Sequence, residues 1–338
     1  MTFREIVGHR RLTTLIARAI ERDSLPPTLL FAGPSGVGKW VVAKATAQAV
    51  NCGSQVAPAG ELAVDACGQC RACDRIARGV HVDVNMLEPD DRASIKIDVV
   101  RDVLLRTGFR PFEGRQRVVL IRDADALEQA SQNALLKALE EPPPGTMFIL
   151  TTAVPGTLLP TVRSRCMRLG FGRLTAAEIA SALIRDHDYG DADARQAAPL
   201  ADGSLGQALA LIDNDLSMFR DLAMGLLRHT TARADAQSRT QAASALHTGS
   251  AKKERTREDV ALVLRLMASM LRDLEAINAG ADVSVLANPL QTRDLEALAR
   301  AYTGDRARAA FVAVDRALTA LERNAGTKVV TEWLAVQM

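Results

Sequence analysis

The residues best suited to chemistry in this 338-residue chain form a glycine-rich loop at positions 33–40, Gly-Pro-Ser-Gly-Val-Gly-Lys-Trp. In loops of this form, backbone N–H groups converge on phosphates and the Lys pairs with their charge. The candidate nucleotide-binding residues are Gly33, Gly36, Gly38 and Lys39. A Ser or Thr hydroxyl normally follows the Lys and binds Mg²⁺, but Trp40 has one N–H donor and no oxygen. The loop keeps a phosphate cradle and lacks a metal ligand, so ATP or ADP binding stays open.

A second departure follows the apolar run 117–121, which has the form of a strand that precedes an acidic pair. In such a pair one carboxylate helps to hold Mg²⁺ and a neighbouring Glu orients water. Here the next residues are Arg122 and Asp123. Arg122 repels a cation, and an Asp is shorter than a Glu by one methylene. A register shifted by one residue would leave Asp123 followed by Ala124, which still lacks the Glu.

Four of the five cysteines are spaced as metal ligands. Their pattern is C-x14-C-x2-C-x2-C, formed by Cys52, Cys67, Cys70 and Cys73. Four thiolates that reach one tetrahedral centre favour Zn²⁺ over free thiols or an iron–sulfur cluster. Because all four ligands come from the protein, no coordination position is open, and we expect a structural zinc site.

A short basic segment, 161–166, contains Arg163 and Arg165 within Ser164-Arg165-Cys166. The segment is consistent with a solvated turn, since unpaired Arg side chains are costly to bury. It is equally consistent with an arginine finger, a planar cation presented to the γ-phosphate of a neighbouring subunit. The physics of these residues alone does not choose between the two.

The first half of the chain alternates strand and helix patterns. Short apolar runs predict strands at 28–32, 82–87, 117–121 and 147–152, and helical spacing predicts helices at 11–22, 97–106 and 129–141. Buried strands separated by helix-length segments indicate a parallel sheet covered on both faces. We therefore predict an α/β domain that ends near Leu169, with Ser164-Arg165-Cys166 after its last strand.

From Thr175 onward strand patterns are absent, and Ala, Leu and Arg recur at helical spacing. Thr175 and Glu178 form a capping box that begins a small helical unit, and we place a domain boundary near Asn214. The polar stretch 229–259 contains the basic residues Lys252, Lys253, Arg255 and Arg257. An exposed loop is favoured over a nucleic-acid-binding patch, because runs of charge are usually solvated.

Composition narrows the class of protein. Hydrophobic residues make up 48% of the chain, and the formal net charge of +2 gives no global basic field, so any nucleic-acid contact would be local. The N-terminal residues carry mixed charge without an apolar core of a signal peptide, and no apolar stretch is long enough to span a bilayer. We expect a soluble cytoplasmic protein with no membrane contact.

Together, the segment 133–143 (Asn-Ala-Leu-Leu-Lys-Ala-Leu-Glu-Glu-Pro-Pro), Ser164-Arg165-Cys166, the four cysteines and the altered glycine loop resemble bacterial DNA polymerase III clamp-loader subunits. The resemblance implies an AAA+ α/β domain over 1–170 with a zinc module at about 51–75. It also implies a helical lid over 171–214 and an all-α collar over 215–338 that assembles a hetero-pentameric ring. Members of this family are ATPase subunits, called tau or gamma, or the delta-prime subunit, which commonly lacks competent ATP hydrolysis.

Three departures make this chain similar to the delta-prime branch. They are Trp40, the pair Arg122 and Asp123, and Gly206, which stands where the ATPase subunits carry a phosphate-sensing Arg. The resemblance also implies that Arg165 acts in trans on ATP held by the adjacent subunit. Implied partners are the tau/gamma and delta subunits, and, through the complex, the sliding clamp and primed DNA.

Two other functions are consistent with parts of the chain. The first is an ATP-hydrolysing subunit of the tau/gamma type, which Trp40, Arg122 and Gly206 disfavour. The second is a zinc-bearing nucleic-acid-binding regulator, which requires a basic, aromatic surface around the metal. The stretch 53–65 carries only Glu61 and Asp65 as charged residues, which disfavours this second function.

Overall fold

The computed structural model describes residues 2–57, 62–90, 93–213, 216–231, 241, 243–246, 248, 255–282, 285–288, 291–323 and 325–338. The chain divides into two compact units, and each is described by itself. Unit 1 comprises Met1–His187 and Gly203–Gln207, and unit 2 comprises Asp188–Asp202 and Ala208–Met338. No helix among the described residues is long and apolar enough to cross a membrane.

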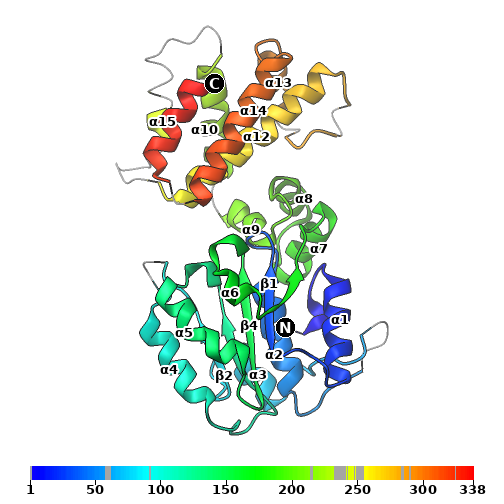
Figure 1. The fold of residues 1–338 in the computed structure, drawn as a ribbon. Coiled ribbons are helices and arrows are strands. Elements are labelled where there is room, and N and C mark those ends of the chain that lie inside the picture. The colour runs from blue at the N-terminus through cyan, green and yellow to red at the C-terminus, as the bar shows by residue number, and fades with distance from the viewer. Residues whose placement is uncertain are drawn as a thin grey trace. The chain divides into compact units, whose positions relative to one another are not determined.

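Unit 1 is built on a five-stranded sheet in which every strand pair is parallel (Figure 1). The strand order is β2-β3-β4-β1-β5. The strands are β1 (Thr28–Ala32), β2 (Val84–Leu87), β3 (Arg117–Ile121), β4 (Thr146–Thr152) and β5 (Met167–Gly170). All residues of β1, β3 and β4 are buried, which explains why their sequences are continuous apolar runs rather than alternating ones.

Helices cover both faces of this sheet, as predicted. One face packs against η1 (Phe3–Glu5), α1 (Arg10–Glu21), α2 (Lys39–Asn51) and α3 (Arg71–Ala77). The other face packs against α4 (Ile97–Thr107), α5 (Gln129–Glu140) and α6 (Pro160–Arg163). Alternate strand residues enter the two cores: Leu29 and Phe31 of β1 face the first, and Leu30 faces the second. Short 3-10 turns, η2 (Ala124–Ala126) and η3 (Pro155–Thr157), follow β3 and β4.

The structure corrects two features of the predicted sheet. A fifth strand, β5, follows Ser164-Arg165-Cys166, so this segment does not come after the last strand. Only Leu169 of β5 is buried, and a strand with three exposed residues leaves no apolar run in the sequence. In addition, β2 begins at Val84 and not at Val82, because residues 81–84 form a turn in which the Val84 N–H donates to the His81 carbonyl at 3.1 Å. The Asp83 side chain of this turn holds a neighbouring loop.

That loop, 108–116, is held by a buried ion pair. Asp83 accepts hydrogen bonds from the backbone N–H groups of Phe112, Glu113 and Gly114, each at 2.8 Å. Its carboxylate also pairs with Arg117 at 3.0 Å. Burial raises the pKa of Asp83, but these donors outweigh it and lower the pKa to about 2. Asp83 is therefore charged and satisfied in the folded protein at neutral pH.

Replacing Asp83 with Asn is expected to destabilise unit 1 by about 3 kcal/mol at pH 7, because one partner of a buried ion pair is removed. The stability that comes from the lowered pKa is fully present above about pH 4 and is lost as the pH falls toward 2. The difference in unfolding free energy between wild type and Asp83→Asn should therefore narrow between about pH 4 and pH 2. Urea unfolding followed by Trp40 fluorescence in a Trp333→Phe background measures it, and Asp102→Asn, at an exposed position of α4, is the control. A gap independent of pH would contradict this assignment.

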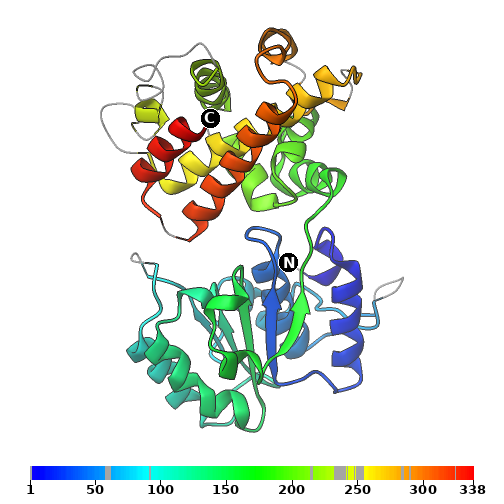
Figure 2. The ribbon, with the colours of Figure 1, turned by 45° about the horizontal axis from the view of Figure 1, so that its top comes forward.

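Unit 2 consists mainly of helices joined by turns over its described residues. Its helices are α8 (Asp191–Leu200), most of α9 (Leu205–Asp213), α10 (Leu216–His229), α12 (Arg257–Asn278), α13 (Thr292–Ala299), α14 (Asp305–Glu322) and α15 (Thr327–Gln337). The long helices α12 and α14, yellow and orange in Figure 2, lie side by side, and α15 packs on α14. Tyr302 is fully buried and donates to the Leu227 carbonyl at 2.8 Å, which ties the turn before α14 to α10.

The helical region begins with α7 (Ala176–His187), whose first turn is closed by the predicted capping box of Thr175 and Glu178. The predicted lid, 171–214, is divided between the two units, so a separate lid and a separate collar over 215–338 stay predictions. The boundary residue Asn214 lies outside the described residues, as do Lys252 and Lys253 of the basic stretch.

Candidate functional site

The glycine loop joins the carboxyl end of β1 to the N-terminus of α2, the place where phosphate-binding loops of α/β proteins lie. Gly38 caps α2 with a φ of 101°, a conformation that side-chain-bearing residues rarely adopt. His9 holds the loop from the other side through Nε2 and the Val37 carbonyl, 2.8 Å apart. The predicted residues thus lie in one continuous loop at the carboxyl ends of the strands: Gly33, Gly36, Gly38 and Lys39.

Lys39 is directed into its own loop. Its Nζ donates to the carbonyls of Gly33 at 2.7 Å and Pro34 at 2.6 Å, and the residue is only 6% exposed. Burial lowers the pKa of Lys39, and the charges of Asp123 and Asp125 oppose this effect. The Lys39 amine, which would pair with a phosphate, is therefore present and is hydrogen-bonded to carbonyls of its own loop.

The two residues that depart from a metal-binding site contact each other. The guanidinium carbon of Arg122 lies 6.0 Å from the centroid of the Trp40 ring, which is the geometry of a cation–π contact. Arg122 also pairs with Glu88, which follows β2, at 3.0 Å and with Asp123 at 3.5 Å. An indole and a guanidinium therefore lie together next to Lys39, where an ATPase loop would supply oxygen ligands.

The carboxylates near this site have other roles. Asp125 accepts a hydrogen bond from the Thr152 hydroxyl at 2.7 Å and one from the Ala153 N–H at 3.2 Å, which connects the turn after β3 to the end of β4. Burial raises the pKa of Asp123, and the neighbouring Arg122 opposes this effect. The predicted strand 117–121 is confirmed, and Arg122 is the first residue beyond it.

Arg165 lies at a different place, in the turn between α6 and β5. Its guanidinium donates to the Thr161 carbonyl at 3.0 Å and to Glu140 at 2.9 Å, and its side chain is 29% exposed. The side chain is thus neither a freely solvated surface Arg nor a buried one. A surface ion pair of this kind contributes less than about 1 kcal/mol, so Arg165 can leave Glu140 at low cost.

The four predicted metal-binding cysteines come together, since their Sγ atoms all lie within 4.8 Å of one another. Cys52 caps the end of α2, and Cys70 and Cys73 lie at the start of α3. Backbone N–H groups of Cys67 and Cys70 point at the sulfurs of Cys52 and Cys67, at 3.3 and 3.2 Å.

This cluster fits a tetrahedral metal ion. Zn–S bonds of about 2.3 Å place four sulfurs about 3.8 Å apart, and Cys52 Sγ lies 3.9 Å from Cys70 Sγ. Burial raises the pKa of Cys70, but backbone N–H groups of Cys73 and Gly53 help to lower it to about 6, which favours the thiolate that binds metal. The four residues could hold a metal ion that joins α2 to α3.

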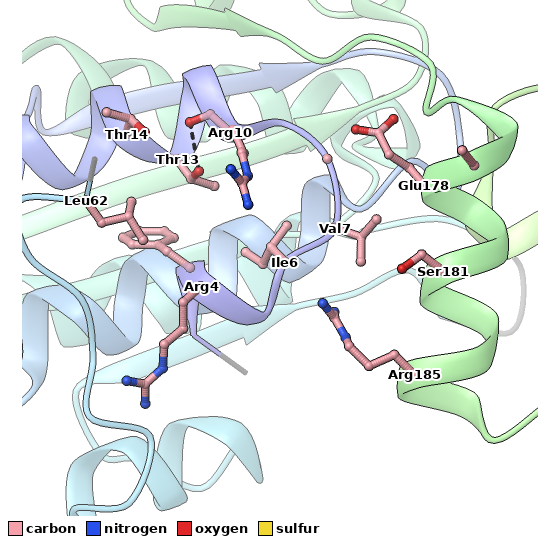
Figure 3. A pocket seen from close by; sticks show the side chains of 13 residues that line it. Arg4, Ile6, Val7, Arg10, Thr13, Thr14, Leu62, Glu178, Ser181 and Arg185 are labelled. Atoms are coloured by element: carbon pink, nitrogen blue, oxygen red, sulfur yellow. Dashed lines mark hydrogen bonds between the residues drawn. The ribbon is translucent and has the colours of Figure 1, made fainter. Parts of the chain in front are cut away.

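A separate pocket of about 610 Å³ lies among the N-terminal segment, α1, Leu62 and α7 (Figure 3). Arg10 and Arg185 extend over the same opening, with Ile6 and Val7 between them. Arg185 is already paired with Asp186 at 2.6 Å. No residue of the glycine loop, 33–40, lines this pocket, so it is distinct from the candidate phosphate-binding loop.

Glu88 and Glu140 pair with Arg122 and Arg165, and no sequence motif pointed to either pairing. Glu88 was recoverable from its position at the carboxyl end of a strand next to β3, because such ends share one edge of the sheet. Glu140 belongs to the motif 133–143, but its pairing with Arg165 spans 25 residues and has no local signal.

Comparison with known proteins assigns the family. A family model described as DNA polymerase III, delta subunit, matches residues 8–175. Through this segment, the chain belongs to the DNA polymerase III clamp-loader subunit family. This clamp-loader subunit is 33% identical to DNA polymerase III subunit tau of Bacillus subtilis over 225 residues, which are 65% of the chain and 38% of the relative.

Further similar proteins carry names from the same polymerase. DNA polymerase III subunit tau of Escherichia coli is 33% identical over 221 residues, which are 64% of this chain and 33% of the relative. The chain therefore spans only about a third of the length of these curated relatives. A solved structure of a gamma-subunit-related protein from Thermotoga maritima is 17% identical, with a TM-score of 0.44, and covers 96% of this chain and 97% of its own.

Proposed function

We propose that this chain is the delta-prime subunit of the clamp loader, a ring member that does not hydrolyse ATP and supplies Arg165 to the ATP site of a neighbour. The observation that carries the proposal is the contact between Trp40 and Arg122. The two departures are 82 positions apart in the sequence, and the fold brings both to the place where an ATPase would hold Mg²⁺.

The physical effect of this contact is to replace metal ligands with a cation. Mg²⁺ requires near-octahedral oxygen coordination. Trp40 supplies no oxygen, and the guanidinium of Arg122 adds positive charge that Glu88 and Asp123 neutralise. A nucleotide in this loop would therefore lack the metal that neutralises charge during phosphoryl transfer.

The rest of the proposal follows from the family resemblance. Partners are the tau/gamma subunits, which bind and hydrolyse ATP, and the delta subunit, in a ring of five chains. Arg165 reaches across to a neighbour's ATP, and the ring places the sliding clamp on primed DNA in the cytoplasm during replication. Zinc at the four cysteines is structural, and it holds the insertion between α2 and α3.

The proposal predicts that Mg²⁺ does not strengthen ATP binding to the isolated chain and that no ATP is hydrolysed. Equilibrium dialysis with labelled ATP, with Mg²⁺ and with EDTA, measures the first, and phosphate release measures the second. The double variant Trp40→Thr/Arg122→Asp is the matched control, because it restores two oxygen ligands and should make ATP binding depend on Mg²⁺. Hydrolysis by the wild-type chain would contradict the proposal.

The alternative is an ATP-hydrolysing subunit of the tau/gamma type. It is favoured by the relatives named tau, which are 33% identical over the matched region. The contact between Trp40 and Arg122 argues against it. The same hydrolysis assay separates the two functions, since a tau/gamma-type chain would release phosphate without a partner.

A further inference from the structure

Residues 2–9 form a strap that runs from the cysteine cluster to the glycine loop. The strap is held near the cluster by Asp65, which is fully buried. The Asp65 carboxylate accepts hydrogen bonds from the backbone N–H groups of Phe3 at 3.0 Å and Arg4 at 3.1 Å. At the other end of the strap, the His9 ring bonds the Val37 carbonyl of the glycine loop. A carboxylate that lies two positions before a metal ligand in the sequence therefore fixes the first residues of the strap.

Two side chains of the strap are buried against the cluster. Phe3 is 2% exposed and belongs to the same core as the buried cysteines of the cluster. Thr2 is fully buried, and a Cβ added at Gly68, between the second and third cysteines, would lie 3.2 Å from Thr2 Cγ2. The strap thus packs directly on a turn that carries metal ligands.

Asp65 is positioned by the segment between the first two cysteines of the cluster. Cys52 and Cys67 bound this segment, and the Cys67 N–H donor nitrogen lies 3.3 Å from the Cys52 sulfur. Within the segment, Val56 and Asp65 exchange backbone hydrogen bonds of 3.0 and 2.8 Å. A metal ion bonded to both cysteines would close the segment into a loop and restrict the conformations that it can adopt. Metal binding therefore favours the position in which Asp65 meets the strap.

We propose that metal binding by the four cysteines and docking of residues 2–5 on Asp65 are coupled, so that each stabilises the other. The inference rests on the proposed zinc site and adds a consequence, which is that the N-terminal strap depends on the metal as well as the insertion. Coupling between two such events is reciprocal. The factor by which zinc favours the docked strap is therefore also the factor by which the docked strap raises zinc affinity.

Hydrogen exchange at the amides of Phe3 and Arg4 measures docking, because both amides bond Asp65. The full chain is compared with zinc bound and after zinc is removed with EDTA. Protection of the two amides is expected to fall at least about tenfold without zinc. The amides of Val119 and Leu120, in the fully buried strand β3, should remain protected and show that the sheet is still folded.

Zinc affinity tests the same coupling from the other side and does not require a folded zinc-free chain. Phe3→Ala removes the buried side chain that anchors the strap and leaves the charge of the protein unchanged. Competition with a chromogenic zinc chelator should show about tenfold weaker zinc binding in this variant. Leu139→Ala is the matched control, because it removes a buried side chain from the other core of unit 1, and it should bind zinc as wild type does.

The outcomes separate this coupling from the zinc site on which it rests. A wild-type chain that binds no zinc would contradict the proposed zinc site. A chain that binds zinc and keeps the Phe3 and Arg4 amides protected after zinc removal would overturn the coupling alone. Equal zinc affinity of Phe3→Ala and wild type would also overturn it, and both results would leave the cysteines as metal ligands.

Discussion

A clamp loader reconstituted with the Arg165→Ala chain is expected to lose about 10³-fold in turnover at the ATP site that this chain serves. An arginine finger stabilises charge that develops on the transferred phosphoryl group, and Ala leaves that charge uncompensated. Folding should be unaffected, because the Arg165 side chain makes a surface pair with Glu140 and a bond to the Thr161 carbonyl, and Ala keeps the backbone bonds of this residue. Single-site turnover and clamp loading on primed DNA measure the effect.

Two controls distinguish the loss of an arginine finger from the loss of one positive charge at the surface. Arg163→Ala removes an exposed cation from the last position of α6, two residues before Arg165, and it should leave turnover unchanged. Arg165→Lys keeps the charge and loses the planar, bidentate geometry, so it should recover only part of the activity. Size-exclusion chromatography establishes that each complex assembles. Normal turnover in an assembled Arg165→Ala complex would show that Arg165 is not a finger.

Loss of the metal is expected to have the second large effect. Cys67→Ser should abolish the binding of one zinc ion per chain and lower the melting temperature of unit 1 by about 10 °C or more, because metal binding contributes directly to folding free energy. Elemental analysis and calorimetry measure the two quantities. EDTA should reproduce the effect in the wild-type chain.

The chain contains its own control for this experiment. Cys166 is the remaining cysteine, and it is buried in the second core away from the cluster, where burial raises the pKa of its thiol to about 11. Cys166→Ala should therefore retain the full zinc content. An equal loss of zinc in both variants, or none in Cys67→Ser, would exclude the cluster as the metal site.

Most of the sheet could be predicted because fully buried strands leave continuous apolar runs, as in β1, β3 and β4. Edge strand β5 left no such run, since a single residue, Leu169, is buried. The cysteine cluster was predictable from spacing, because all four ligands fall within 22 residues of chain. A strand or a metal site can be predicted from sequence most readily when one short stretch of chain contains all of its residues.

The arrangement of the candidate phosphate-binding site was only partly predictable. Trp40 and Arg122 could each be recognised as a departure, but their contact depends on which strand ends lie next to α2. The bond between Gly206 and Gly36 joins positions 170 residues apart and involves no side chain. Nothing in the local sequence encodes such a backbone contact, which only the fold brings about.

The central claim, that this chain has lost its own hydrolysis and retained a group for its neighbour's, is tested most directly by one comparison. ATP turnover is measured in two reconstituted clamp loaders, one with Lys39→Ala and one with Arg165→Ala in this chain. Turnover is predicted to be unchanged by Lys39→Ala and strongly lowered by Arg165→Ala. Turnover lowered by Lys39→Ala and unchanged by Arg165→Ala would contradict the claim.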